Sequence, residues 1–421
     1  MLLFILGSGI YFSIRLKGIQ FLKFKKAIKA ILGSVKSKGD GNISPYQALM
    51  SALSGIVGNG NIAGVATAIV IGGPGAVFWM WISALILMAT MYAESLLGFK
   101  YREKDKDGTY IGGPMVYILK GKNWKWLAYA FAFAMAVKTL IATTSIQSNS
   151  MSIILNDQFG IPQILSCIVI ALLTWIVIVG GLKKIAVTAQ FLSPIMTLIY
   201  LSAGLIILII NYDQLLNVFN LIISSAFTEH SASGGFAGAT VLMALRYGAA
   251  RGAYSNEAGT GSVAIMHATA KSDNPVRQSL ISMMGVFIDT IIVCSITAFV
   301  ILISGNWTSG LNSTALASGS FNELLVYGNW VVLGSSLLFG YSTLITWCFY
   351  GEQCAAFMLG DNIKKYYRWA FTFAILIGAL SNAENIWSLG DLLNGLTVII
   401  NLIGIIALGP IVIKTTLNYR D

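Results

Sequence analysis

The chain has 421 residues, of which 56% are hydrophobic and only 10% are charged. Because soluble globular domains carry roughly 25% charged residues, this composition excludes an ordinary soluble protein and predicts an all-α, polytopic membrane protein. The net charge of +10 would suggest a nucleic-acid partner for a soluble chain, but in a membrane protein the distribution of Lys and Arg matters more than their sum, so no nucleic acid is expected.

Residues 1–14 are apolar and lead directly into a basic segment at 15–38. A spanning helix needs about 20 apolar residues, so we interpret 1–14 as one extra N-terminal span with a truncated start. In the basic segment, lysines alternate with apolar residues such as Phe21 and Phe24, which is typical of an amphipathic helix on an anionic leaflet. Residues 1–45 therefore form a predicted N-terminal unit.

Ten further apolar segments bring the predicted number of transmembrane helices to about eleven. They lie at 46–71, 74–99, 127–150, 162–181, 185–210, 236–262, 278–304, 329–350, 366–381 and 390–413. Twenty-four of the 27 Lys and Arg residues lie in 15–38 and in the connections on the same side of the membrane. Since positive residues concentrate on the cytoplasmic side, we expect the N-terminus outside and the tail, 414–421, in the cytoplasm.

Residues 46–211 and 236–413 then form two sets of five helices that begin on opposite sides of the membrane. This is the topology of an inverted repeat, in which the first helix of each set is typically discontinuous. The second set opens with a glycine-rich stretch that contains Arg246, Arg251 and Glu257.

The first half of span 46–71 is unsuited to a continuous, lipid-facing helix. Six of the ten residues from Gly55 to Gly64 are Gly or Asn, and both types are poor helix formers. Broken backbone at membrane depth is tolerated where it lines a cavity, and its free amides and carbonyls bind ions and charged groups. Residues 57–61 are therefore the first candidate binding site, although small residues also allow close helix packing.

Four long motifs are distinctive: GNGNIAGVATAIVIGGPGAVFWMW (58–81), GGPMVYI (112–118), ARGAYSNEAGTGSVAIMHA (250–268) and FIDTIIVCSITAFVIL (287–302). They closely resemble the alanine or glycine:cation symporter family, and the likeness runs from about Gly7 to the last span. The resemblance implies sodium-coupled uptake of alanine, glycine or close analogues, by a LeuT-type fold of five plus five helices.

For the substrate, we expect the amides of Asn59 and Gly60, beside Gly58, to hold a carboxylate at a half-helix N-terminus, where the helix dipole favours anions. Gln147 and Asn149 lie in the polar run TTSIQSNS, and one of them would bind the substrate ammonium. Hydrogen bonding between helices is the competing interpretation of both residues.

For the cation, the resemblance implies two sodium sites at the break. The Asn61 side chain and the Ile56 carbonyl would bind one sodium ion beside the substrate carboxylate. The carbonyls of Ser54 and Val57 would bind a second one.

Ser342 and Thr343 are adjacent hydroxyls in the span 329–350, and hydroxyl oxygens suit a small, hard cation. Hydrogen bonding to their own helix is the alternative, but the resemblance to the sodium site of the fold favours ligands. Trp347 follows one turn later and would line the pocket or pack in the core.

Asp289 is a carboxylate near the middle of an apolar span, and such a group is a functional candidate by default. As an anion it would balance a sodium ion, and Thr290 would add an oxygen. The alternative is a buried ion pair with Arg246 or Arg251, and both arginines would otherwise gate the inner side of the second repeat.

Three further ionisable residues are less informative. Lys138 would extend to the interface if it lies near a span end. Glu94 and Glu257 lie toward the inner ends of their spans and are interpreted as structural or gating groups.

The sequence therefore predicts a sodium-coupled symporter of small neutral amino acids in the cell membrane, with the bilayer, the amino acid and Na⁺ as its partners and with no required protein partner. Proton coupling through Asp289 or Glu257 is the alternative within transport. A membrane-embedded hydrolase is a weaker alternative, because the sequence has no GxSxG elbow and no recognisable metal dyad. We expect no enzymatic activity.

Overall fold

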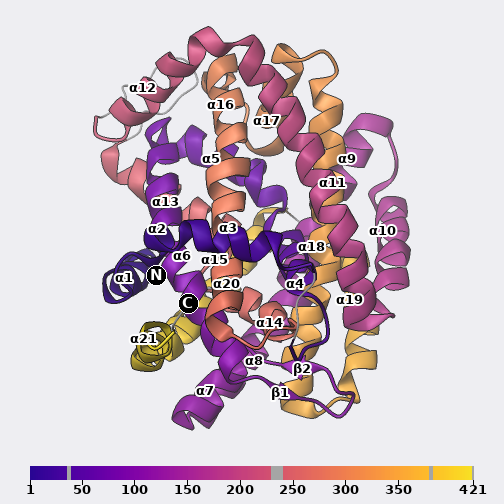
Figure 1. Cartoon of the computed structure of the whole chain (residues 1–421). Coiled ribbons are helices and arrows are strands. Elements are labelled where there is room, and N and C mark those ends of the chain that lie inside the picture. Colours follow the sequence, from indigo (N-terminus) through magenta and orange to yellow (C-terminus); the bar gives the residue numbers. More distant parts are fainter. Residues whose placement is uncertain (36–38, 229–239, 379–382, 420–421) are drawn as a thin grey trace.

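The computed structural model describes residues 1–35, 39–228, 240–378 and 383–419. Across these ranges the regular structure is helical apart from one antiparallel pair of short strands, β1 (Glu103–Lys104) and β2 (Tyr110–Ile111). Figure 1 shows long helices that run over the height of the molecule. The prediction of an all-α chain is confirmed.

Within the described ranges, six helical segments are long and apolar enough to cross a membrane, and one bent pair of helices is a seventh candidate. The six are α6 (Gly75–Lys100), Lys125–Phe159, α11 (Gly181–Ile210), Pro275–Ser304, α18 (Gly328–Leu359) and Leu389–Ala407. The bent pair consists of α4 (Pro45–Ile56) and the segment Asn59–Gly72, which meet at 59°. The predicted break in span 46–71 is therefore present.

The other four predicted spans are also helical. They correspond to α1 (Leu2–Arg15), α10 (Gln163–Ile178), α19 (Ile363–Gly378) and a divided segment with α13 (Val241–Asn256) and α14 (Ser262–Ala268). Residues 236–239 and 379–381 of these predictions lie outside the described residues.

Several predicted boundaries differ from the structure, among them the end of the span predicted at 329–350, since α18 continues to Leu359. The span predicted at 127–150 continues from α8 (Lys125–Val137) through the π-helical segment η2 (Lys138–Thr143) to the end of α9 (Thr144–Phe159), and the last polar residues of this extension, Asp157 and Gln158, are exposed. The span predicted at 390–413 is divided at Leu408 between α20 (Ala383–Ala407) and α21 (Gly409–Leu417). Pro410, in the first turn of α21, has no amide hydrogen with which to continue α20.

The two discontinuous spans run in opposite directions. In Figure 1, α4 and α14 lie in the lower half of the molecule, whereas α5 (Ala63–Gly72) and α13 lie in the upper half. The first broken span therefore runs upward and the second runs downward. In addition, α4 packs against α14, and α5 packs against α13. This is the arrangement that an inverted repeat requires.

Burial separates the central helices from the peripheral ones. The most apolar window of α18 is 72% buried, whereas that of α11 is 33% buried. Because α11 exposes large apolar side chains such as Phe191 and Leu198, we assign its outer face to lipid. The central α18 instead directs its side chains at the broken spans.

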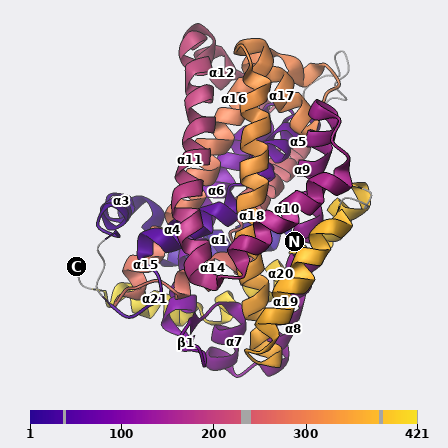
Figure 2. The ribbon, with the colours of Figure 1, turned by 90° about the vertical axis from the view of Figure 1, so that its right-hand side faces the viewer.

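The two ends of the molecule differ in charge. Figures 1 and 2 show α12 (Leu215–Ser225) and α17 (Ser313–Leu324) at one end, and α7 (Pro114–Lys122) with β1 at the other. We call the second end the basic face, because it carries the lysines and arginines of 100–125 and 364–368. Lys364 joins these two segments, since its ammonium is 2.5 Å from an Asp105 carboxylate oxygen.

Candidate functional site

The break in the first span is held open by a side chain. Gly58 is extended, with φ −142° and ψ −165°, so its amide leaves the helical pattern. The Asn61 Oδ1 atom accepts a hydrogen bond from the Gly58 amide at 2.9 Å, while the Thr297 hydroxyl donates to the Asn61 carbonyl at 2.9 Å. Polar side chains therefore form hydrogen bonds with some of the backbone groups that have no helical partner at the η1 turn (Asn59–Asn61).

A buried carboxylate lies next to this turn. Asp289 belongs to the π-helical segment η4 (Phe287–Cys294) and is completely buried. The Asn61 Nδ2 atom donates to Asp289 Oδ1 at 2.6 Å, and the hydroxyls of Ser255 and Thr290 donate to Oδ2 at 3.0 and 2.8 Å. The structure therefore brings Asn61, Asp289 and Thr290 together. It adds Ser255, which the sequence analysis missed because a lone serine in a helix carries no distinctive signal.

The arginine alternative for Asp289 is not borne out. Among the described residues, neither Arg246 nor Arg251 is within ion-pair distance of Asp289. Arg246 is exposed, and the guanidinium of Arg251 lies over the ring of Tyr254 at 6.0 Å from its centre. The arginines lie on α13, on faces of that helix that do not reach the carboxylate.

A second oxygen cluster joins α4 to α18. The Ser342 hydroxyl lies 3.0 Å from the Ser54 carbonyl oxygen, and the Thr343 hydroxyl lies 3.5 Å from the same atom. Both hydroxyls also contact the Phe339 carbonyl within their own helix, so both interpretations of these residues describe part of the geometry. Val57 is buried in an extended conformation at the end of α4, which frees its carbonyl from the helix.

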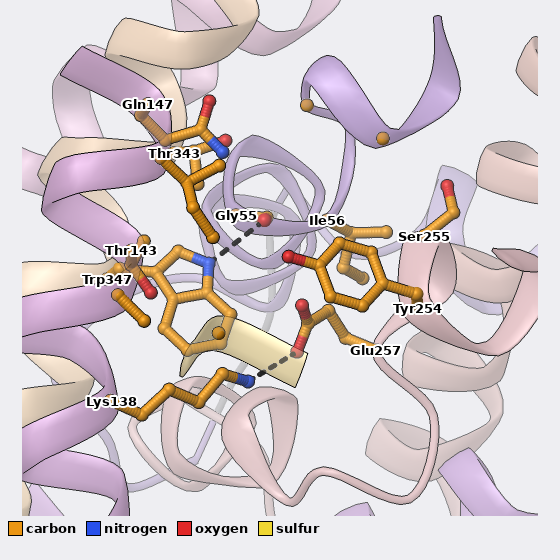
Figure 3. Close-up of a pocket in the computed structure, with 15 residues that line it drawn as sticks. Gly55, Ile56, Lys138, Thr143, Gln147, Tyr254, Ser255, Glu257, Thr343 and Trp347 are labelled. Atoms are coloured by element: carbon orange, nitrogen blue, oxygen red, sulfur yellow. Dashed lines mark hydrogen bonds and ion pairs between the residues drawn. The ribbon is translucent and has the colours of Figure 1, made fainter. Parts of the chain in front are cut away.

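A small cavity of about 40 Å³ lies between the break and the central helices (Figure 3). Its lining includes Ile56, Gly58, Gly60, Gln147 and Thr343, together with Gly55, Lys138, Ala142, Thr143, Ile146, Tyr254, Ser255, Glu257, Trp347 and Gly390. Trp347 forms one wall and donates its indole N–H to the Gly55 carbonyl at 3.1 Å. A void of this volume has room for roughly three water molecules, so only a small ligand fits without rearrangement.

An ion pair lines the same cavity. The Lys138 ammonium lies 3.8 Å from a Glu257 carboxylate oxygen, 2.7 Å from the Asn394 side-chain oxygen and 4.3 Å from the centre of the Trp347 ring (Figure 3). Lys138 is only 5% exposed and lies well inside its span, so the condition under which it would extend to the interface is not met. It begins the π-helical segment in the middle of a 35-residue helix, and such π segments are frequent at functional sites.

The two residues predicted to bind the substrate ammonium, Gln147 and Asn149, make different contacts. Gln147 lines the small cavity, and its Oε1 atom accepts from Asn59 Nδ2 at 3.1 Å. Asn149 instead donates to the Gly378 carbonyl at 3.1 Å, which agrees with the competing interpretation of bonding between helices. The Ser336 hydroxyl donates to Asn59 Oδ1 at 2.5 Å, so Asn59 links α9 to α18.

A larger cavity of about 340 Å³ lies beyond these Asn59 contacts. Its lining comes from α9, α17 and the start of α18, and it includes Ala63, Asn149, Asp157, Ser318 and Asn329. Gly58, directly before Asn59, lines the small cavity, and Ala63, four residues after it, lines the large one.

Glu94 supports the second break, in agreement with the structural interpretation. Asn401 of α20 donates to Glu94 Oε2 at 2.9 Å and to the Gly259 carbonyl at 2.9 Å. The Tyr117 hydroxyl donates to the Asn401 side-chain oxygen. This network fixes the turn between α13 and α14 from the side of the basic face.

Comparison with known proteins adds independent information. The pattern of the sodium:alanine symporter family matches residues 1–421. The chain is 43% identical to the uncharacterized transporter YflA of Bacillus subtilis, covering 97% of this chain and 88% of the relative. It is 40% identical to the sodium/alanine symporter AgcS of Methanococcus maripaludis, covering 100% of this chain and 94% of the relative.

The fold has relatives of known structure. A Na⁺-coupled sialic acid symporter superposes with a TM-score of 0.56 at 14% identity, covering 94% of this chain and 84% of that one. Its arrangement is the LeuT-type fold, so the predicted fold class of five plus five helices is confirmed.

Proposed function

The chain belongs to the sodium:alanine symporter family, and from this premise we propose that it imports alanine and glycine together with Na⁺ by alternating access. The members of this family are membrane proteins that transport amino acids together with a cation. Because the family consists of transporters, the hydrolase alternative is excluded. The choice of small neutral substrates and of sodium is our proposal.

The main support for this proposal is that two clusters of oxygen atoms lie at the same helix break, the one between α4 and α5. One cluster combines the Asn61 side chain with Asp289, Thr290 and Ser255. Carboxylate, hydroxyl and amide oxygens are the ligands that hard cations prefer. In the proposed site, the Asn61 amide oxygen and the Ile56 carbonyl face the ion, and the Asp289 anion balances its charge.

The second proposed sodium site uses Ser342 and Thr343 with the carbonyls of Ser54 and Val57. A sodium ion there would replace the hydrogen bonds that now join α4 to α18. Its binding would fix the relative position of these two helices, and a ligand that binds one conformation better shifts the population toward it. The sodium gradient would thereby favour the state that receives substrate.

The small cavity supports a substrate of minimal size. We propose that the amides at Gly58, Asn59 and Gly60 hold the carboxylate, and that Gln147 accepts a hydrogen bond from the ammonium. Trp347 closes the side of the cavity that faces α18, and the limited volume of about 40 Å³ favours glycine and alanine over longer side chains.

For localisation, we propose the cell membrane with the N-terminus outside, the C-terminal tail in the cytoplasm and the basic face toward the cytoplasm. The support is the concentration of Lys and Arg at that face, because positively charged connections remain on the cytoplasmic side.

The experiment is uptake of radiolabelled alanine into proteoliposomes under an inward gradient of sodium, potassium or protons. Accumulation with sodium alone is the expected result. Accumulation only with protons would refute sodium coupling and would transfer the coupling role to a carboxylate, with Asp289 first. No accumulation under any gradient, in protein that is shown to be folded, would refute the proposed substrate.

A further inference from the structure

The helix α3 (Phe24–Leu32) and the residues before it carry charge of one sign only. Six lysines and arginines lie at 15–29, whereas residues 1–39 contain no Asp or Glu. Lys25 and Lys29 lie one turn apart on α3 and are exposed, and among the described residues neither is within ion-pair distance of a carboxylate. An exposed cluster of positive charge attracts an anionic partner.

The other two faces of α3 have different surroundings. Ala27 and Ala30 are buried, and this side of α3 packs against α15 (Pro275–Val286). Ile28 and Leu32 also lie one turn apart, but they are 41% and 77% exposed. At about 100° of rotation per residue, they form an apolar face directly beside the two exposed lysines. We call the two exposed faces together the α3 surface: Lys25, Ile28, Lys29 and Leu32.

The combination of basic and apolar side chains identifies the partner. Phe21 and Leu22 of α2 (Ile19–Leu22), and Val35 after α3, are also exposed and extend the apolar face. A soluble anion or a nucleic acid would pair with the lysines but would leave these apolar side chains in water. The boundary between the headgroups and the acyl chains of a membrane accommodates both kinds of side chain. Acidic phospholipid headgroups in that boundary attract lysines, so the chemistry of the α3 surface fits an acidic phospholipid.

The helix α3 also touches α15 at two distant points. A Cβ atom placed on Gly33 would lie 3.2 Å from a guanidinium nitrogen of Arg277, in the first turn of α15. At the other end, the rings of Phe24 and Phe287 meet edge to face, with 4.9 Å between their centres. Phe287 begins the π-helical segment η4, and Asp289 follows two residues later. Figure 1 shows α3 in front of α15, and Figure 2 shows it at the edge of the molecule.

We propose that the α3 surface binds acidic phospholipid of the adjacent leaflet, and that this contact supports the π-helical segment with Asp289 through the pair Phe24–Phe287. Lipid held at α3 keeps the helix pressed on α15, so the ring of Phe24 stays against the first residue of η4. The transport rate therefore depends on the acidic lipid content of the membrane. The lipid contact is independent of the proposed function, whereas its effect on uptake rests on it.

The first measurement detects the lipid next to α3 in the full-length protein. A bimane fluorophore is attached to Leu32→Cys, since the four native cysteines are buried. The protein is reconstituted into mixtures of phosphatidylcholine and phosphatidylglycerol in which one lipid or the other is brominated and quenches the fluorophore. We expect brominated phosphatidylglycerol to quench more than its share of the mixture. Adding Lys25→Gln and Lys29→Gln should lower this preference on the order of tenfold.

The matched control is Lys106→Gln with Lys122→Gln in the same labelled protein. Both lysines are exposed and lie at the basic face, on the β1–β2 connection and at the end of α7. The control removes the same charge as the α3 variant but leaves the α3 surface intact. Its preference for phosphatidylglycerol should equal that of the labelled parent.

The second measurement is the initial rate of sodium-driven alanine uptake into vesicles with and without phosphatidylglycerol, without the fluorophore. Wild type should be at least about twofold faster with the acidic lipid, because a ligand that binds one conformation better shifts the population toward it. Phe24→Leu, made without the lysine changes, should keep the lipid preference in the quenching assay but lose the gain in uptake. This variant meets the same surface potential as wild type, so its loss would not reflect a different sodium concentration at the membrane.

Each outcome decides one part of the proposal. Equal quenching by the two lipids, or no quenching by either, would overturn the α3 surface as an acidic-lipid site. An unchanged preference in the Lys25→Gln, Lys29→Gln variant would do the same. A gain in uptake that persists in Phe24→Leu would overturn the link to η4. Wild type without sodium-driven uptake in any vesicle would refute the proposed function, while the quenching result would still decide the lipid site.

Discussion

The Asn61 side chain uses both ends of its amide. Its oxygen accepts from the Gly58 amide and its nitrogen donates to Asp289, so one residue connects the backbone of the break to the buried carboxylate. Both residues are recognisable in the sequence, because Asn61 belongs to a Gly- and Asn-rich stretch of poor helix formers and Asp289 is a carboxylate in an apolar span. Their mutual contact was not predictable, since it depends on how two helices 228 residues apart in the sequence pack.

Replacing Asp289 by Asn tests the charge of this cluster. The amide has nearly the same shape, and its single oxygen can still accept from Ser255 and Thr290. Its NH₂ group replaces the oxygen that accepts from Asn61, and the side chain no longer balances a cation. We expect the sodium concentration that gives half-maximal alanine uptake to rise about tenfold, equivalent to about 1.4 kcal/mol of lost binding. Asp213→Asn, at an exposed position, is the control and should behave as wild type. An unchanged sodium requirement in Asp289→Asn would exclude Asp289 from the cation site.

Gly58→Ala tests the cavity volume. The new methyl group would lie 3.1 Å from the Thr343 hydroxyl and 4.0 Å from the Gln147 amide nitrogen, inside the space proposed for the substrate. We expect alanine uptake to fall at least about tenfold while glycine uptake falls less, because one methyl group corresponds to roughly 1–3 kcal/mol of discrimination in a tight pocket. Uptake of both amino acids is measured in competition.

The matched control is Gly64→Ala in α5, where an added methyl group meets no atom within 4 Å. This variant should transport both amino acids at the wild-type rate. If Gly58→Ala reduced glycine and alanine uptake equally, the cavity would not be the determinant of substrate size.

At the scale of helices, both breaks were predictable from composition, whereas the π-helical segments were not. A π segment adds one residue to a turn and rotates everything after it by about 100° relative to the regular α-helical pattern. A uniform 3.6-residue period therefore does not describe which side chains of α9 share a face with those of α8. The position of Lys138 against Trp347 and Glu257 depends on helix packing and was not predictable from the sequence.

The Lys138–Glu257 pair should behave as a unit that joins the π segment of one repeat to the break of the other. Lys138→Met or Glu257→Gln alone would leave one buried charge without its partner, and such changes typically cost about 3–5 kcal/mol. We therefore expect each single variant to lose thermal stability in detergent and to be inactive. The double variant should regain stability, because no charge remains unpaired.

Uptake by the double variant then separates two roles. Restored stability with restored uptake would show that the pair only holds the helices together. Restored stability without uptake is our expectation, since both groups line the substrate cavity. Equal stability of both single variants and wild type would contradict the pairing itself.

At the scale of the whole molecule, the order of the helical spans followed from hydropathy, because hydropathy is a property of whole segments and tolerates errors of several residues. The orientation inferred from charge remains our proposal. The domain limits at 46–211 and 236–413 remain our proposal. The contact between the basic segments 100–125 and 364–368 was not predictable, since it depends on individual pairs such as Lys364 with Asp105. Arg102 similarly joins the end of α14 to the first of these segments through the carbonyls of Ala268 and Ala270.

The orientation in the membrane has a direct test in intact cells. The four native cysteines are buried and should not react with a membrane-impermeant maleimide, since reaction requires an accessible thiolate. Two single substitutions at exposed positions supply the reporters: Ser309→Cys near α17, and Lys106→Cys between β1 and β2. We expect the reagent to label Ser309→Cys in intact cells and to label Lys106→Cys only after permeabilisation. The opposite pattern would place the basic face outside and would contradict the proposed orientation.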